Sequence, residues 1–293
     1  MTRLLDAHIH FWDPRARHHD WLSEAPALQR RFGPEDLDLG GHTLSGAVFV
    51  QADCRDEEAL DEVHWVQALA AEQPLIRGIV AYAPVHLGEL AEDHLRALAG
   101  EPLVVGVRRL LQGRPVETIT APALITGVRM LAAWDLTFDL CATHDQLSQA
   151  CRLVRSCPET RFVLNHLGKP PVRTRAFDPW RADLEKLAIL PNVVCKLSGL
   201  ATEAAPGRGE ADAGPYLAYA LETFGPRRCM VASDWPVVTL ATSVARWFDV
   251  VLEVVARLSP KDRAAVLEGT ACATYGLERR RLSTATAPTG RTS

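Results

Sequence analysis

The chain of 293 residues exceeds the usual size of one domain, but a single α/β barrel commonly reaches this length. Its hydrophobic content of 47% and charged content of 23% are ordinary for a globular protein with one large core. The formal net charge of −4 gives no electrostatic reason to expect nucleic acid or an anionic membrane surface as a partner.

The segment His8-Ile9-His10 lies where the first predicted strand, residues 4–8, ends. Side chains two residues apart on a strand project to the same face, so both imidazoles can point to one end of the fold. Seen alone, the pair is equally compatible with two incidental polar residues in a loop. The next segment, residues 11–42, is long and aromatic, and we expect it to fold over the mouth of the fold as a lid or loop.

Four further strands are predicted at residues 46–51, 76–81, 104–110 and 136–142. Gln51 ends the first of these, and the pair Arg108 and Arg109 closes the third. Neighbouring strand residues face opposite ways, so only one arginine should enter the mouth, and the sequence leaves open which. His144 follows the strand at 136–142, where it is compatible with a metal ligand, a helix cap or a solvated side chain.

The last three predicted strands, residues 161–166, 193–197 and 229–232, each carry a polar residue in or directly after an apolar run. His166 ends the first, and Lys196 lies within the second, where it is hard to place unless its ammonium group reaches the mouth. Asp234 terminates the third. The structural alternatives are a capping histidine, a snorkelling core lysine and an N-cap aspartate.

Amphipathic helices are predicted between these strands, for example at residues 56–71, 145–155, 214–224 and 241–258. Strand–helix alternation over eight strands predicts a parallel sheet closed as a (β/α)8 TIM barrel. An open doubly wound sheet is the rival, but it commonly carries a glycine-rich phosphate loop where this chain has Asp6-Ala7-His8-Ile9-His10. We expect one catalytic domain at residues 1–278 and a flexible polar tail at 279–293.

The barrel would gather His8, His10, His166 and Asp234 at the C-terminal ends of its strands, where the catalytic groups of barrels collect. Neutral imidazoles and a carboxylate can bind a divalent ion such as zinc, and the same aspartate can take a proton from attacking water. Trp12 and Trp235 flank these residues and, together with polar groups, suit a hydroxylated ring. The substrate-binding residues predicted from the sequence are Gln51, Arg108, Arg109, Lys196, Trp12 and Trp235.

Four motifs resemble the amidohydrolase-2 branch of the amidohydrolase superfamily, and within it the sugar lactonases of the L-fucono- and L-rhamnono-lactonase type. The resemblance spans residues 4–277 and implies an amidohydrolase-like barrel with His8, His10, His166 and Asp234 at its site. Relatives are often active without added metal, so it implies one weakly bound divalent ion, zinc before others, or none. The motifs are Asp6-Ala7-His8-Ile9-His10-Phe11-Trp12, Leu164-Asn165-His166-Leu167-Gly168-Lys169-Pro170, Cys195-Lys196-Leu197-Ser198-Gly199-Leu200 and Ala232-Ser233-Asp234-Trp235-Pro236.

The resulting hypothesis is a hydrolase of carbohydrate catabolism that opens an aldonolactone, such as L-fuconolactone or L-rhamnonolactone, with Asp234 as the general base. Lys196 and one of Arg108 and Arg109 would hold ring hydroxyls or the oxyanion. The alternatives are a metal-dependent decarboxylase of an unsaturated acid, a hydrolase of a carboxylated lactone from aromatic catabolism, and a binding module. A decarboxylase should lose activity on chelation, and a carboxylated substrate calls for several inward arginines.

The same sequence predicts a cytoplasmic protein with a small-molecule lactone, and neither nucleic acid nor membrane, as its partner. Asp6 precedes any long apolar segment, and no stretch approaches the roughly 20 apolar residues of a membrane span. The seven cysteines form no CxxC pair and are odd in number, which indicates neither a disulfide framework nor a zinc ribbon. The oligomeric state is left open, a homo-oligomer included.

Overall fold

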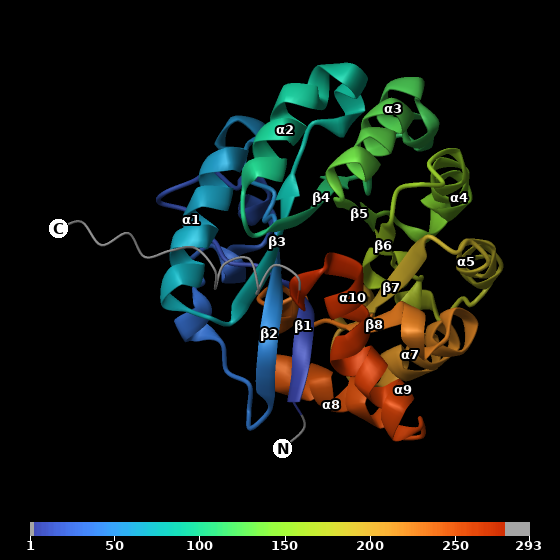
Figure 1. Cartoon of the computed structure of the whole chain (residues 1–293). Helices are drawn as coiled ribbons and strands as arrows, with labels where there is room; N and C mark the ends of the chain where they lie inside the picture. The colour runs from blue at the N-terminus through green and yellow to red at the C-terminus, as the bar shows by residue number, and fades with distance from the viewer. Residues whose placement is uncertain (1–2, 279–293) are drawn as a thin grey trace.

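Eight parallel strands form one sheet in the order β1 to β8 in the computed structural model, which describes residues 3–278 (Figure 1). The predicted tail at 279–293 therefore lies outside the described residues. Each strand pairs with the next along the chain, which confirms the predicted barrel. The strands are β1 Arg3–Ile9, β2 Thr43–Val50, β3 Ile76–Tyr82, β4 Val104–Leu110, β5 Thr137–Cys141, β6 Phe162–Leu164, β7 Val193–Leu197 and β8 Cys229–Val231.

Helices surround the strands in chain order, so that each crossover packs against the outer face of the sheet (Figure 1). None of the helices described within residues 3–278 has the length and apolarity needed to cross a bilayer. The helices are α1 Ala59–Glu72, α2 Glu92–Gly100, α3 Pro122–Met130, α4 Leu147–Ser156, α5 Trp180–Ala188, α6 Leu200–Glu203, α7 Gly209–Phe224, α8 Val244–Val255, α9 Pro260–Ala264 and α10 Thr270–Tyr275.

The apolar residues of the strands serve two separate cores, which is why their sequences read as nearly continuous hydrophobic runs. The larger core lies between the sheet and the helices, and a smaller core fills the barrel interior with residues such as Leu5, Val48 and Met230. Ala271 and Tyr275 of α10 belong to the inner core, so the C-terminal helix closes one end of the barrel (Figure 1).

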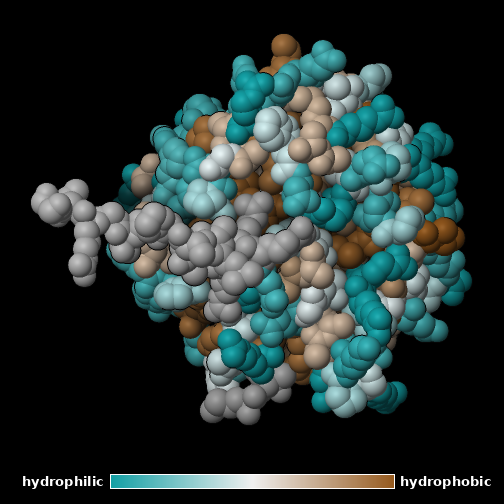
Figure 2. Space-filling model, viewed as in Figure 1, coloured by the Kyte–Doolittle hydropathy of each residue, from teal (hydrophilic) through white to brown (hydrophobic). Residues whose placement is uncertain are grey.

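The outer surface is mixed in character. On the face shown in Figure 2, hydrophilic side chains predominate and hydrophobic ones are scattered among them. All seven cysteines lie within the described residues and are free thiols, six of them buried. A buried reduced cysteine acts as a small hydrophobe.

The barrel closes at one seam, where the end of β1 meets the segment that follows β8. Ile9 forms an isolated parallel bridge with Trp235, and the backbone N–H of His10 donates to the Trp235 carbonyl over 2.7 Å. The N–H of Asp234 donates to the His8 carbonyl over 2.9 Å. Two of the predicted histidines and the predicted aspartate therefore lie on opposite sides of the same seam.

Two strands end before the polar site residue that follows them, because that residue leaves the extended conformation. The predicted strand at 161–166 ends at Leu164, and His166 (φ 53°) and Leu167 (φ 55°) adopt left-handed backbone angles in the turn that follows. Likewise β8 ends at Val231, before Asp234 at φ 64°. Left-handed residues other than glycine are uncommon and are concentrated at functional sites.

Candidate active site

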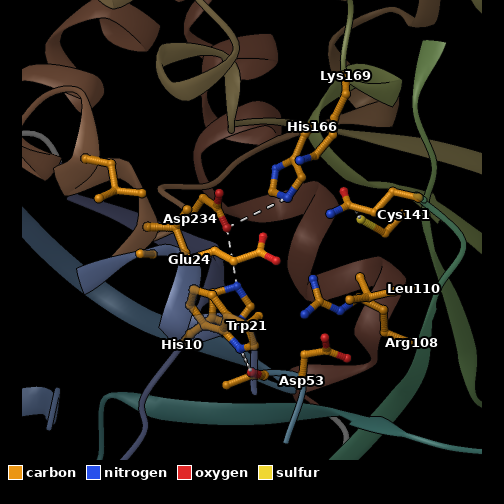
Figure 3. A pocket seen from close by; sticks show the side chains of 15 residues that line it. His10, Trp21, Glu24, Asp53, Arg108, Leu110, Cys141, His166, Lys169 and Asp234 are labelled. Carbon is orange, nitrogen blue, oxygen red and sulfur yellow. Dashed lines mark hydrogen bonds and ion pairs between the residues drawn. The ribbon is translucent and has the colours of Figure 1, made fainter. Parts of the chain in front are cut away.

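Three imidazoles surround one carboxylate oxygen at the C-terminal ends of the strands, and Figure 3 shows two of them, His10 and His166, beside Asp234. Oδ1 of Asp234 lies 3.5 Å from Nε2 of His8, 3.3 Å from Nε2 of His10 and 3.7 Å from Nε2 of His166. The two nitrogens of His8 and His10 are 3.1 Å apart. The structure thus brings together the four residues that the sequence predicts as catalytic.

The carboxylate of Asp6 fixes the position of Asp234 through the backbone next to it. This Asp6 carboxylate accepts hydrogen bonds from the N–H groups of Ser233 (2.9 Å) and His8 (3.1 Å), and from the Ser233 hydroxyl. The Ser233 hydroxyl oxygen in turn accepts from the N–H of Trp235 over 2.9 Å. Because these bonds hold both sides of the seam, the direction of the Asp234 side chain is set by the backbone on either side of it.

His166 is held by the loop that follows β7. Its Nδ1 lies 2.9 Å from the Ser198 hydroxyl, and its ring packs against the backbone of Gly199. Gly199 has φ +74°, and a Cβ atom built there would lie 2.5 Å from Cγ of His166. Only glycine satisfies both the left-handed backbone and the close approach of the imidazole.

A fully buried ion pair supports His8 from the barrel interior. Nζ of Lys196 pairs with Oδ2 of Asp139 over 2.5 Å and lies 3.2 Å from Nδ1 of His8. The hydroxyl of Tyr275, from α10, donates to Asp139 over 3.0 Å, and the Asn165 amide donates to it over 2.9 Å. These bonds give both buried charges hydrogen-bond partners. They also place the Lys196 ammonium group beside Nδ1 of His8.

The contacts of the two rings determine where their protons lie. A carbonyl oxygen only accepts, so Nδ1 of His10 donates to Val50 over 2.7 Å, and Nε2 of the neutral ring carries no proton. A protonated Lys196 can only donate to Nδ1 of His8, which leaves the His8 proton on Nε2. Nε2 of His8 can then donate to Nε2 of His10 or to Asp234.

Burial lowers the pKa of all three imidazoles, strongly for His8 and to about 3 for His166. Burial alone would raise the pKa of the Asp234 carboxyl, but His166, His10 and Lys169 outweigh it and hold that pKa below its ordinary value. At neutral pH the site therefore contains an ionised carboxylate among neutral rings. An ionised carboxylate of this kind can accept a proton from water.

The donor set of His8, His10 and Asp234 fits a divalent ion. Their ligand atoms all lie within 4.8 Å of one another, and this group, found within residues 3–278, does not include His166. Zinc bonds of about 2.0–2.2 Å put neighbouring ligand atoms of one ion about 3–3.5 Å apart, and the observed separations are 3.1, 3.3 and 3.5 Å. His8 could bind through Nε2 only after losing the proton carried there.

The site opens into a cavity of about 350 Å³, near the lower end of the range for small-molecule pockets. Arg108, which is 5% exposed, lines this cavity and donates from Nη2 to the Gln51 carbonyl. Lys169 also lines it and pairs with Glu203 over 3.0 Å. The cavity is lined by His10, Trp21, Glu24, Ala25, Ala52, Asp53, Arg108, Leu110, Gln112, Cys141, His166, Lys169, Asp234, Val237 and Leu240.

Three of the polar residues predicted to bind substrate lie outside this lining. Arg109 points away from the cavity and donates to the Tyr82 hydroxyl over 3.1 Å, so Arg108 is the inward member of the pair. Gln51 is 1% exposed, and its side-chain oxygen accepts from the N–H of Asp53. Lys196 is fully buried beside His8, which is itself fully buried and outside the lining.

The two predicted indoles are also buried away from the cavity. Nε1 of Trp12 donates to the carbonyl of Arg30 over 2.9 Å, and Trp235 packs edge-to-face against Phe11 and Phe32. The indole that lines the cavity is that of Trp21, within the predicted lid segment. His144 lies outside the lining too, with its Nδ1 3.1 Å from the Lys169 carbonyl.

Some residues of the site were missed by sequence reasoning. Asp139 carried a usable signal, because a carboxylate in the middle of an apolar strand demands a buried partner. The sequence gives no such signal for Trp21, Glu24 and Asp53. They lie in irregular segments, where residues of one kind do not recur at a fixed spacing. Their contribution to the site depends on how the loops fold over the barrel.

Sequence comparison matches residues 5–277 to the family model described as amidohydrolase. An L-fucono-1,5-lactonase of Burkholderia ambifaria is 31% identical over 287 residues, which cover 95% of this chain and 97% of the relative. An L-fucono-1,5-lactonase of Burkholderia multivorans is 33% identical over 295 residues, covering 93% and 96%. A crystal structure of an amidohydrolase from Burkholderia multivorans with bound zinc has a TM-score of 0.82 and 31% identity, and covers 94% of this chain and 99% of that one.

Proposed function

The chain belongs to the amidohydrolase family, and from that premise we propose that it hydrolyses the ester bond of a sugar-acid lactone. Two relatives of similar length are L-fucono-1,5-lactonases, which supports an aldonolactone such as L-fuconolactone or L-rhamnonolactone as the substrate. A cavity of about 350 Å³ suits a substrate of one small ring.

One observation carries the proposal. Asp234 is ionised and 6% exposed, borders the cavity, and faces three neutral imidazoles within 3.7 Å. A carboxylate that served only to cap a helix would have no reason to be surrounded by rings from β1 and the turn after β6. An ionised carboxylate at the wall of a substrate-sized cavity is suited to general-base catalysis.

The hydrolysis proceeds in two steps. Asp234 takes a proton from water as the water oxygen bonds to the lactone carbonyl carbon, and the carbonyl oxygen becomes an oxyanion. The ring C–O bond then breaks, and the proton on Asp234 passes to the leaving ring oxygen. The product is an open-chain hydroxy acid, with one water consumed.

The neighbouring groups stabilise the charge that develops on the carbonyl oxygen. Arg108 lines the cavity and its guanidinium is the donor nearest to this oxygen, while His8, fully buried with Nε2 3.5 Å from Nη1 of Arg108, lies behind the lining. Lys196 acts through His8 by fixing its proton on Nε2. Removing one such donor costs roughly 100-fold or more in turnover.

A divalent ion held by His8, His10 and Asp234 would act as a Lewis acid on the carbonyl or on water. Zinc is the ion that this set of two nitrogens and one carboxylate oxygen fits best. Without an ion, the hydrogen-bond chain from Lys196 through His8 to His10 leaves each of these groups partnered. The residues therefore support either state.

A pH-indicator screen of aldonolactones, with and without chelator, tests the proposal. We expect acid release on at least one 6-deoxy aldonolactone well above the rate in buffer alone. Activity that survives chelation assigns the chemistry to the protein groups, and loss restored by added zinc assigns a role to the ion. Rates no higher than the buffer blank across the panel would refute lactone hydrolysis.

A further inference from the structure

One wall of the cavity is formed by Trp21, Glu24 and Asp53, which we call the acidic wall (Figure 3). Trp21 and Glu24 belong to the short helical turn Asp20–Glu24 after β1, and Asp53 lies three residues beyond β2. All three line the same cavity as His10, His166 and Asp234. None of them takes part in the proposed proton transfer.

The acidic wall is held in place by hydrogen bonds to and within the segment after β2. Nε1 of Trp21 donates to the Ala52 carbonyl over 2.9 Å, which ties the indole to the residue next to Asp53. Asp53 has φ +56°, and its N–H donates to Oε1 of Gln51 over 2.6 Å. Gln51 is buried and thereby maintains a left-handed backbone that aspartate adopts only at a cost.

The two carboxylates of the acidic wall are exposed and form no hydrogen bond or ion pair within the described residues. Neither Glu24 nor Asp53 forms a side-chain hydrogen bond or ion pair with another described residue, whereas Lys169 across the cavity is paired with Glu203. Arg108 lines the same cavity and is 5% exposed; its Nη2 donates to the Gln51 carbonyl, and its buried Nε has no hydrogen-bond partner in residues 3–278. Two hydrogen-bond acceptors, the carboxylates of Glu24 and Asp53, are thus left available in the cavity.

We propose that Trp21, Glu24 and Asp53 bind the hydroxyl-bearing part of the substrate and select neutral polyhydroxylated lactones. The indole offers an apolar face to ring C–H groups, and the carboxylates accept hydrogen bonds from hydroxyls. This inference rests on the proposed function and adds the substrate feature that the site recognises.

The same wall excludes negatively charged substrates. Glu24, Asp53 and Asp234 give the cavity three carboxylates, against Arg108 and the already paired Lys169. A carboxylate group on the substrate placed against the acidic wall would meet like charge, which disfavours its binding. A lactone bearing a carboxylate is therefore a poor substrate.

The test compares wild type, Glu24→Gln and Asp53→Asn on two lactones of the same ring size. One lactone carries ring hydroxyls, and the other is unsubstituted δ-valerolactone. The readout is the ratio of kcat/KM for the hydroxylated lactone to that for δ-valerolactone. We expect each variant to lower this ratio about tenfold or more, mainly through KM, because a hydrogen bond to a charged acceptor is replaced by a weaker one.

Glu57→Gln is the matched control, since Glu57 is exposed, lies four residues beyond Asp53 and does not line the cavity. It should keep the wild-type ratio. An unchanged ratio in both Glu24→Gln and Asp53→Asn would overturn the inference, as would equal losses on the two lactones. A wild type that opens neither lactone would instead refute the proposed function, so the two failures are distinguishable.

Discussion

The approach of Gly199 to His166 gives a prediction at the scale of one residue. Gly199→Ala adds a Cβ atom that would lie 2.5 Å from the imidazole, at a left-handed φ of +74°. We expect a loss of stability and, because the ring must move, a fall in kcat of tenfold or more, on the order of the cost of a misplaced catalytic group. Thermal unfolding and steady-state kinetics measure the two effects.

Gly207→Ala is the matched control, because Gly207 has φ +72° and nothing within 4 Å of an added Cβ atom. It imposes the same backbone strain of about 1–2 kcal/mol without a collision. We expect it to lower stability and to leave kcat unchanged. Equal activity in the two alanine variants would show that the His166 position does not depend on Gly199.

The buried neutral imidazoles predict a pH dependence of folding. His166 titrates near 6.5 in the unfolded chain and at about 3 in the folded protein, so the unfolded state binds more protons between these values. The contribution of the ring to stability is complete above pH ~6.5 and is lost as the pH falls, by about 1.4 kcal/mol per pH unit. Replacing His166 by Asn should remove this part of the change in unfolding free energy with pH.

Urea unfolding of wild type and His166→Asn between pH 7.5 and 5 measures the difference. The comparison between the two proteins is needed because Asp6 and Glu62 have pKa values raised by burial to about 6 and about 7. Those carboxyls take up protons in the folded state and stabilise it as the pH falls, against the effect of the ring. Parallel curves for the two proteins would contradict a neutral buried His166.

Individual residues of the site differ in how far the sequence reveals them. The placement of His8, His10 and Asp234 at the barrel mouth follows from strand ends and side-chain alternation, which a sequence records. Lys196 was expected to reach the mouth, but its ammonium group lies with Asp139 in the interior. Its direction depends on a partner 57 residues away in the chain, which no local pattern discloses.

At the scale of elements, the seam between β1 and the segment after β8 contributes both to the stability of the fold and to the position of Asp234. Ser233→Ala removes the hydroxyl that donates to Asp6 and accepts from the N–H of Trp235. We expect a loss of about 1–3 kcal/mol in stability, because buried polar groups lose their partner. We also expect lower kcat, since Asp234 is the next residue.

Ser243→Ala provides the comparison for this variant. The Ser243 side chain accepts from the N–H of Arg246 at the start of α8, and its loss should cost about 1 kcal/mol. It lies outside the cavity lining, so kcat should stay at the wild-type value. A Ser233→Ala variant that is destabilised but fully active would show that the seam does not position Asp234.

Whether a segment forms a helix or a strand could be predicted where its apolar residues recur at a regular spacing. The expected strand at 104–110 is β4 in full, and the expected helix at 241–258 contains α8. The predicted strand at 161–166 ended early, because His166 and Leu167 turn into left-handed angles that packing against Gly199 and β7 supports. Tertiary contacts of that kind override the local preference for an extended strand.

At the scale of the whole molecule, the alternation of strands and helices was sufficient to predict the barrel and the end at which its catalytic candidates lie. The contents of the cavity could not be predicted in the same way. Trp21, Glu24 and Asp53 reach it from irregular loops, and Tyr275 enters the barrel from the last helix. These contacts arise only once the barrel has closed.

The central claim is that Asp234 takes the proton from the attacking water. The most direct measurement is kcat/KM of Asp234→Asn on the best aldonolactone, beside Asp249→Asn, which changes an exposed carboxylate outside the cavity. We predict a fall of about 100-fold or more for Asp234→Asn, in a protein that still unfolds cooperatively, and no change for the control. A rate for Asp234→Asn near that of the wild type would contradict the account.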